Sequence, residues 1–240
     1  IWNLDGSQIL YVAKKEYGTN YAKSTNTDIY SYDLHSNSTI NLTKDNQGYD
    51  TNPSFSKEGV LAWLQMHEPG YEADKNDIIV RYKGQDLNLT SNWDGTVDSF
   101  SWSNNGKKVY FIAPINGTKQ LFFIEFQGSK KISFEVNQLT DGDFDVNAIV
   151  GFSETAVLVT RTDMNHAPEV YSYDLTKKTW NQVTKVKNLG FRENLIKPKT
   201  KIGLSSFLFL IEKWRNDLNI KKIKLPFNFS INILHRTEVT

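Results

Sequence analysis

Tyr30-Ser31-Tyr32-Asp33-Leu34 occurs a second time, unchanged, as Tyr171-Ser172-Tyr173-Asp174-Leu175. The two copies lie 141 residues apart, which is three steps of 47. A unit repeated at about 40 to 50 residues is typical of propeller blades and solenoids. A second phrase keeps nearly the same spacing and closes each unit: Leu42-Thr43, Leu89-Thr90, Leu139-Thr140 and Val183-Thr184. The first 185 residues therefore contain four copies of one structural unit.

The internal pattern of the unit predicts four antiparallel strands. In the third copy, Asn105-Gly106 stands between the strand ending at Trp102 and the apolar run 109–113. Asn-Gly at this place predicts a tight hairpin turn, because both residues tolerate positive φ. The corresponding residues of the other copies are Asp5-Gly6, Glu58-Gly59 and Ser153-Glu154-Thr155, and the last must turn differently. Third strands are predicted at 28–34, 77–82, 120–126 and 169–175, each followed by a short closing strand.

Four-stranded units of this length indicate an all-β fold, a β-propeller with about four consecutive blades. The second strands at 9–13 and 109–113 are apolar on both faces, as a blade between two neighbours requires. A long β-sandwich also has strands at short intervals, but its fold does not explain why one pentapeptide recurs at a multiple of the repeat length.

The composition divides the chain at its end. Residues 1–184 hold 16 basic and 23 acidic side chains, whereas residues 185–240 hold 12 basic and 4 acidic. The repeat pattern stops near residue 189, so we expect blades over 1–188 and an irregular, poorly packed tail over 189–240. That tail is either a linker into another domain or a segment translated out of frame, and the second interpretation is preferred.

Several classes of partner and cofactor are not indicated. The chain has no cysteine, which excludes disulfides and thiolate metal sites. Asp141-Gly142-Asp143-Phe144-Asp145 begins like a calcium loop, but Val146 and Phe152 occupy the positions of the required Gly and Glu. We therefore expect no metal and no cofactor. The basic tail carries no nucleic-acid motif, and its longest apolar run, 207–211, is too short to span a membrane.

Longer phrases resemble one family. They are Gly70-Tyr71-Glu72-Ala73-Asp74-Lys75, Gly117-Thr118-Lys119-Gln120-Leu121-Phe122, Gly142-Asp143-Phe144-Asp145-Val146 and Arg161-Thr162-Asp163-Met164-Asn165-His166-Ala167. They are similar to the propeller of the prolyl oligopeptidase family, in its bacterial dipeptidyl-peptidase and acylaminoacyl-peptidase branch, over residues 2–185. The resemblance implies a ring of seven or eight blades joined to a C-terminal α/β-hydrolase domain that removes short units from peptide N-termini. It also implies a periplasmic or secreted enzyme. Because the chain begins inside a predicted strand, we expect that its true N-terminus, with any signal region, is missing.

The chain departs from this family pattern because it has no catalytic serine motif. The nucleophile elbow requires Gly-x-Ser-x-Gly, and the nearest sequence within the predicted blades is Gly151-Phe152-Ser153-Glu154-Thr155. We therefore expect a truncated propeller without peptidase activity, which would gate peptide access to a hydrolase domain absent from this chain. Two alternatives stay open: a TolB-like propeller that binds a partner protein, and a self-sufficient four-bladed ring.

Two segments supply candidate residues for binding a peptide substrate. Residues 66–75 form a polar insertion with Glu68, Tyr71 and Glu72, and a carboxylate is the natural partner of a peptide's N-terminal ammonium. The alternative is a solvated loop. Residues 161–167 are predicted to form a second loop that offers Arg161, Asp163, Asn165 and His166. There, His166 either faces the substrate or makes a hydrogen bond that shapes the loop, and Arg161 and Asp163 have the alternative of pairing with each other.

Overall fold

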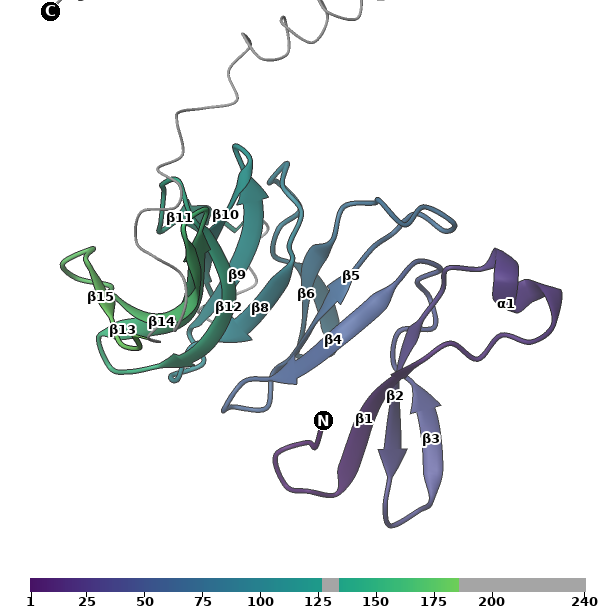
Figure 1. Cartoon of the computed structure of the whole chain (residues 1–240). Helices are drawn as coiled ribbons and strands as arrows, with labels where there is room; N and C mark the ends of the chain where they lie inside the picture. Colours follow the sequence, from purple (N-terminus) through teal and green to yellow (C-terminus); the bar gives the residue numbers. More distant parts are fainter. Residues whose placement is uncertain (127–133, 186–240) are drawn as a thin grey trace, which may run out of the picture. The chain divides into compact units, whose positions relative to one another are not determined.

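The computed structural model describes residues 1–126 and 134–185, all of which belong to one compact unit, Ile1–Glu193. Within these residues the chain forms four antiparallel sheets, one after another along the sequence (Figure 1). The all-β prediction is confirmed, and the one helix among them, α1 (Thr19–Lys23), has five residues. The predicted tail, residues 189–240, lies outside the described residues.

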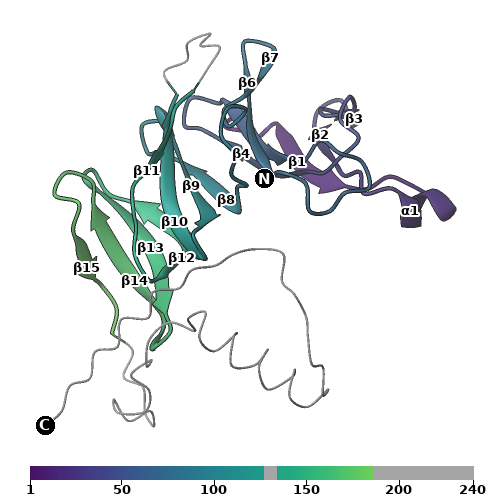
Figure 2. The same ribbon diagram turned by 90° about the horizontal axis from the view of Figure 1, so that it is seen from above.

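Each sheet follows a simple up-and-down order, so strands adjacent in sequence are adjacent in space (Figures 1 and 2). The first sheet contains β1 (Gln8–Ala13), β2 (Asp28–Asp33) and β3 (Ser38–Asn41). The second contains β4 (Asp50–Phe55), β5 (Leu61–Gln65), β6 (Asp77–Tyr82) and β7 (Gln85–Asn88). The third contains β8 (Ser99–Trp102), β9 (Lys108–Ile115), β10 (Thr118–Glu125) and β11 (Val136–Gln138). The fourth contains β12 (Asp145–Phe152), β13 (Ala156–Asp163), β14 (His166–Asp174) and β15 (Trp180–Gln182).

The first sheet has three named strands where four were predicted. In place of a fourth strand, Trp2 forms an isolated antiparallel bridge with Ile9 of β1. The other three sheets have the four strands that the sequence predicted.

The threonine that closes each unit replaces a missing backbone partner. Its hydroxyl accepts a hydrogen bond from a backbone N–H near the start of the third strand, where the short fourth strand has already ended. The four bonds are Ile29 to Thr43 (3.0 Å), Ile78 to Thr90 (3.1 Å), Leu121 to Thr140 (2.9 Å) and Val170 to Thr184 (2.9 Å). The recurring Leu-Thr or Val-Thr phrase is thus explained by the need to satisfy a buried donor.

The repeated pentapeptide ends in the same turn in both copies. The Asp33 carboxylate accepts the backbone N–H groups of His35 and Ser36, at 3.0 and 2.8 Å. Asp174 accepts those of Thr176 and Lys177, at 2.9 and 2.8 Å. Aspartate is favoured here because its short side chain can bond to the backbone two or three residues ahead.

These turns predict a pH effect. Hydrogen bonds from Ser36, from the side chain of Gln8 and from His35 lower the pKa of Asp33 from 3.8 to about 2. A carboxyl group with a lowered pKa stabilises the fold above its ordinary pKa, and that contribution is lost as pH falls toward 2. We expect Asp33→Asn to reduce the loss of stability between pH 4 and pH 2, measured by denaturant unfolding. Asp94→Asn, at an exposed carboxylate, is the control. Equal pH dependence of Asp33→Asn and the wild-type chain would refute this.

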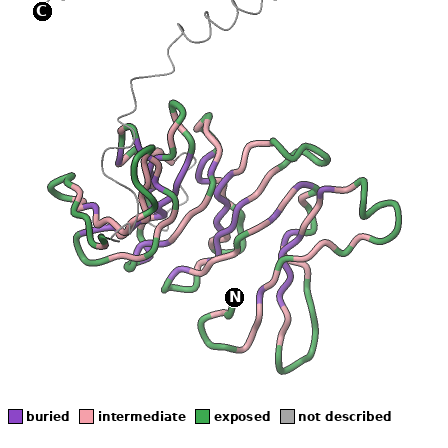
Figure 3. Tube along the Cα trace, in the orientation of Figure 1, coloured by how far each residue is buried: buried purple, intermediate pink, exposed green. Residues whose placement is uncertain are grey.

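The cores lie between successive sheets, because the second strands of the two middle sheets, β5 and β9, bury both faces. In β9, Val109, Phe111 and Ala113 pack toward the second sheet, whereas Tyr110 and Ile112 pack toward the fourth. In β5, Ala62 and Leu64 pack toward the third sheet, and Leu61 and Trp63 toward the first. Figure 3 shows the buried residues concentrated in these strands. Side-by-side packing of meander sheets is the arrangement of propeller blades.

Two local expectations were wrong. In β1 the apolar run is not buried on both faces: Leu10 is buried on one face, but Ile9 and Tyr11 on the other face are only half-buried. Among the described residues, the first sheet has a sheet packed against only one of its faces, in the cluster of Leu10 with Trp63. In the turns between first and second strands, only the glycine takes positive φ, as at Gly6, Gly59 and Gly106. These turns are longer than two residues, so the preceding residue keeps an ordinary backbone conformation.

Candidate functional site

The two ends of the blades differ in their connections. Because the strands alternate in direction, all connections between second and third strands leave the same end, here called the loop end. They comprise residues 14–27, 66–76, 116–117 and 164–165. The connections between first and second strands lie at the opposite end, here called the turn end. All seven residues that the sequence singled out lie at or near the loop end.

The connection from β5 to β6 is held in shape by Asp74. Its carboxylate accepts the backbone N–H groups of His67, Glu68 and Lys75, each at 2.8 Å. Burial raises the pKa of Asp74, but these bonds outweigh it and the net shift is downward. The connection is also tied to the first sheet, because the Gly70 N–H donates to the Thr25 hydroxyl at 2.8 Å. This polar insertion is therefore an ordered structure.

The three candidates on this connection have different surroundings. Glu68 and Tyr71 are exposed, and the Tyr71 side chain is one of the large apolar groups open to solvent, with 56% exposure. Glu72 lies near Tyr49, and burial together with the Glu72 carboxylate raises the pKa of that tyrosine. Glu72 is thus engaged by its own chain, while Glu68 offers its carboxylate to solvent.

Arg161 is part of the packing of the fourth blade. Its guanidinium lies over three aromatic rings, with ring centroids at 3.8 Å for Phe144, 5.0 Å for Tyr171 and 5.2 Å for Trp180. These distances are within the range for cation–π attraction. The structure gives Arg161 and Asp163 different partners, in place of the pairing with each other that was an open alternative.

This packing leads to a stability prediction. We expect Arg161→Ala to lower the free energy of unfolding by about 2 kcal/mol, because three ring contacts and the buried stem are lost. Arg161→Lys should recover part of this, since an ammonium keeps the charge but not the flat stacking surface. Denaturant unfolding measures both. An Arg161→Ala variant as stable as the wild-type chain would contradict the assignment.

The predicted loop over 161–167 is a tight hairpin, which corrects the expectation. Asp163 of β13 pairs in register with His166 of β14, and only Met164 and Asn165 form the turn. The Asp163 carboxylate accepts the backbone N–H groups of Asn165 (2.8 Å) and His166 (3.0 Å), and lies 2.7 Å from His166 Nδ1. Burial raises the pKa of Asp163, but these bonds lower it on balance. The His166 hydrogen bond therefore shapes the hairpin.

The structure does not bring the seven candidates into one cluster. Glu68, Tyr71 and Glu72 belong to the second sheet, and the 164–165 turn to the fourth, with the third sheet between them. Asp163, Asn165 and His166 form one local group. What the loop end offers is a set of exposed polar groups on separate blades.

The turn end carries clefts that the sequence did not predict. One lies between the second and third blades, has a volume of about 540 Å³ and is lined in part by Glu58, Tyr82, Lys107 and Phe126. Another, of about 480 Å³, lies between the third and fourth blades. One feature of the sequence could have predicted these clefts: the Glu58-Gly59 and Asn105-Gly106 turns recur at the same place in the repeat, so their polar residues lie at the same end of adjacent blades.

Within residues 1–126 and 134–185, no group of three or more His, Asp or Glu side chains is arranged to hold a metal ion. The same residues include no helix that could span a membrane.

Comparison with known proteins agrees with the family resemblance found in the sequence. Residues 80–197 match the family model of the dipeptidyl peptidase IV N-terminal region. Dipeptidyl-peptidase 5 of Porphyromonas endodontalis is 36% identical over 186 residues, which cover 75% of this chain and 26% of the relative. These are propeller blades of the dipeptidyl-peptidase and prolyl oligopeptidase family. Dipeptidyl-peptidase 5 of Porphyromonas gingivalis is 35% identical over 147 residues, or 60% of this chain and 21% of the relative. The chain thus spans about a quarter of the length of these two relatives.

Solved structures support the fold. The acylaminoacyl peptidase of Pyrococcus horikoshii superimposes with a TM-score of 0.59 and 19% identity, covering 79% of this chain and 27% of that one. The β-propeller domain of the trilobed protease from Pyrococcus furiosus gives a TM-score of 0.57 and 16% identity, covering 80% and 52%. At these identities the likeness concerns the fold alone. The solved structures thus support the propeller architecture, and the family assignment rests on the sequence matches.

Proposed function

We propose that these blades belong to the propeller of a serine exopeptidase, where they control which peptides reach an α/β-hydrolase domain. The observation that carries the proposal is the match of 186 residues, at 36% identity, to a dipeptidyl-peptidase 5. The match covers three quarters of this chain, so it extends over most of the blades. It favours a peptidase over a TolB-like binding propeller.

The blades contribute selection and not bond cleavage. The sequence holds no Gly-x-Ser-x-Gly in its 240 residues and therefore lacks the motif of a nucleophile elbow. Rigid sheets with ordered connections are suited to restricting access, because a folded protein cannot enter where an extended peptide can. We expect the purified chain to release no chromophore from dipeptidyl or acylaminoacyl substrates, and measurable, serine-reagent-sensitive hydrolysis would overturn this.

The loop end is the part that we assign to the substrate. Glu68 is exposed, sits on an ordered connection and has a free carboxylate, so it is the best candidate to bind the ammonium of a peptide N-terminus. Tyr71 and Asn165 would add contacts, and Asp163 with His166 would hold the second hairpin in position. Glu72 and Arg161 support the fold of their own blades.

A chimera tests this function. Residues 2–185 would replace the matching blades in the dipeptidyl-peptidase 5 of Porphyromonas endodontalis, and dipeptide release from short peptides would be measured. We expect the chimera to cleave short peptides and to leave folded proteins uncut. Glu68→Gln in the chimera should raise KM for free N-termini with little change in kcat, and Glu154→Gln, at an exposed carboxylate of the turn end, should change neither. A folded chimera that cleaves folded proteins, or a Glu68→Gln variant with unaltered KM, would contradict the proposal.

A further inference from the structure

The cleft between the second and third blades lies at the turn end, opposite the connections assigned to the substrate. One wall is formed by the β4–β5 turn and the end of β6, and the other by the β8–β9 turn and the end of β10. Its volume of about 540 Å³ is sufficient for one or two side chains of a ligand. It is thus a second site, separate from the proposed function and independent of it.

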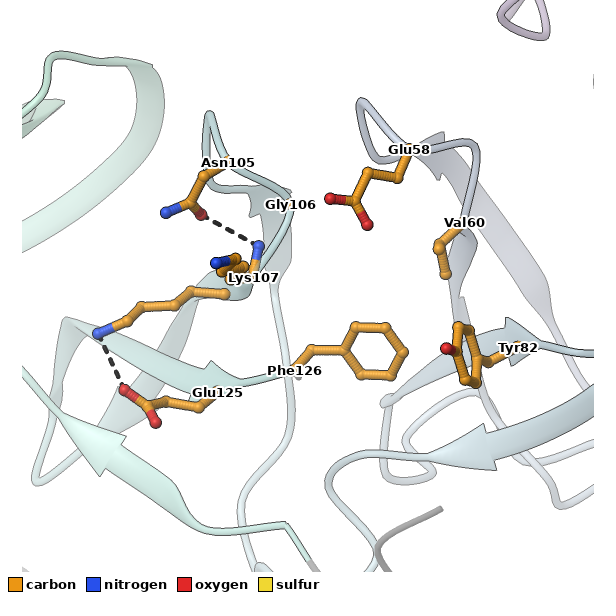
Figure 4. Close-up of a pocket in the computed structure, with 9 residues that line it drawn as sticks. Glu58, Val60, Tyr82, Asn105, Gly106, Lys107, Glu125 and Phe126 are labelled. Carbon is orange, nitrogen blue, oxygen red and sulfur yellow. Dashed lines mark hydrogen bonds and ion pairs between the residues drawn. The ribbon is translucent and has the colours of Figure 1, made fainter. Parts of the chain in front are cut away.

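One part of the inner surface of the cleft is apolar and aromatic. Figure 4 shows the ring of Phe126 directed toward Tyr82, with Val60 beside Tyr82. The Tyr82 and Phe126 rings meet edge to face, with centroids 5.5 Å apart. Phe126 is buried, while Val60 and Tyr82 are half-buried and accessible from the cleft. The stem of a long side chain would find an apolar wall here.

The rim of the cleft carries a carboxylate without a partner. Figure 4 shows the Glu58 side chain directed toward the turn at Gly106 on the opposite blade. Its carboxyl carbon lies 3.9 Å from the place that a Cβ on Gly106 would occupy. Among the residues that the structure describes, none forms an ion pair or hydrogen bond with this carboxylate. By contrast, Glu125 is bound by the Lys108 ammonium at 3.1 Å.

This chain repeatedly places cations over its aromatic rings. The Lys83 ammonium lies 5.1 Å from the Tyr82 ring, and the Arg81 guanidinium 5.2 Å from the Trp63 ring. Lys108 lies 4.6 Å from the Phe123 ring. The faces of such rings attract cations and repel carboxylates. Residues 1–184 also carry seven more acidic than basic side chains, which favours a basic ligand.

We propose that this cleft binds an arginine side chain of a peptide or protein segment. The guanidinium would pair with the Glu58 carboxylate, which accepts two of its N–H groups, and the stem would lie along Val60 and Tyr82. Lys107, on the opposite rim, has a like charge and weakens the binding of any second cation. The site would therefore select a segment with an isolated arginine.

The test uses the 240-residue chain and two blocked tripeptides, acetyl-Ala-Arg-Ala-amide and its citrulline analogue, which has nearly the same shape without the charge. Binding is followed by the amide chemical shifts of Gly59, Gly106 and Lys107. The arginine peptide should give saturable shifts at these amides. The citrulline peptide should bind about tenfold more weakly, since a charge-assisted bond is replaced by a neutral one.

Variants locate the interaction. Glu58→Gln should weaken binding of the arginine peptide about tenfold, and Lys107→Ala should strengthen it. Asp94→Asn, which removes an exposed carboxylate in the connection from β7 to β8 and outside the cleft, should leave the affinity unchanged. Equal binding of the two peptides, no effect of Glu58→Gln in a folded variant, or shifts confined to the loop end would each overturn the proposal.

Discussion

Asp50→Ala is expected to lower the free energy of unfolding by about 3 kcal/mol, because it leaves buried donors without an acceptor. Asp50 is fully buried at the start of β4. Its carboxylate accepts hydrogen bonds from Trp63 Nε1 at 2.8 Å, Gln65 Nε2 at 2.7 Å and Asn46 Nδ2 at 3.0 Å. Trp63 is itself 1% exposed, so its indole N–H has no access to water after the change. Asp94→Ala, at an exposed site, should cost less than about 0.5 kcal/mol.

The pH dependence of Asp50 has the opposite sign to that of Asp33. Burial raises the pKa of Asp50, although bonds from Asn46, Gln65 and Trp63 lower it in part. The folded state therefore binds more protons than the unfolded state between 3.8 and the raised pKa, and stability falls as pH rises through that window. We expect the stability advantage of the wild-type chain over Asp50→Asn to be largest in acid and to shrink toward neutral pH. Denaturant unfolding at several pH values measures this advantage, and one that grows with pH would contradict it.

Gly48→Ala is the second change with a large expected effect, about 2 to 3 kcal/mol of lost stability. A Cβ on Gly48 would stand 2.1 Å from the backbone oxygen of Met66, closer than any real contact. The backbone cannot retreat easily, because the Met66 N–H donates to the Tyr49 oxygen at 2.8 Å. The clash would therefore displace the connection from β5 to β6, which carries Glu68.

Thermal or denaturant unfolding gives the stability of Gly48→Ala, and the amide shifts of Glu68 and Gly70 report the displaced connection. Gly151→Ala is the matched control in β12, since the nearest atom to its added Cβ is 3.9 Å away. The control should be nearly neutral. A Gly48→Ala chain with wild-type stability and unchanged shifts would show that the two backbones are not in close contact.

The repeated phrases made the blades predictable, because each phrase performs one local task. The closing threonines bond to the third strand, and Asp33 and Asp174 shape the following turn, so both recur at fixed positions. Local hydrogen bonds of this kind are encoded within a few residues or within one sheet, and sequence spacing reveals them.

The site was less predictable, because its contacts join residues that are distant in the sequence. The rings around Arg161 come from three stretches of the sequence, at Phe144, Tyr171 and Trp180, so the segment 161–167 alone suggested a free loop. Likewise, Glu58 and Lys107 line one cleft although they lie 49 positions apart. Periodicity shows that such residues are equivalent, but not which of them face each other.

Hydrogen bonds of the threonine hydroxyls stabilise each sheet, whereas apolar clusters hold neighbouring sheets together, and this difference affects how neighbouring blades separate. Each closing threonine bonds within its own sheet, whereas the clusters around Phe111 and Tyr110 each join two sheets. Separation of neighbouring blades would expose apolar side chains to water while the amides of Ile78 and Leu121 keep their acceptors. Hydrogen–deuterium exchange at those amides would then stay slow even in a partly opened molecule, so blades can detach as intact pieces before any of them unravels.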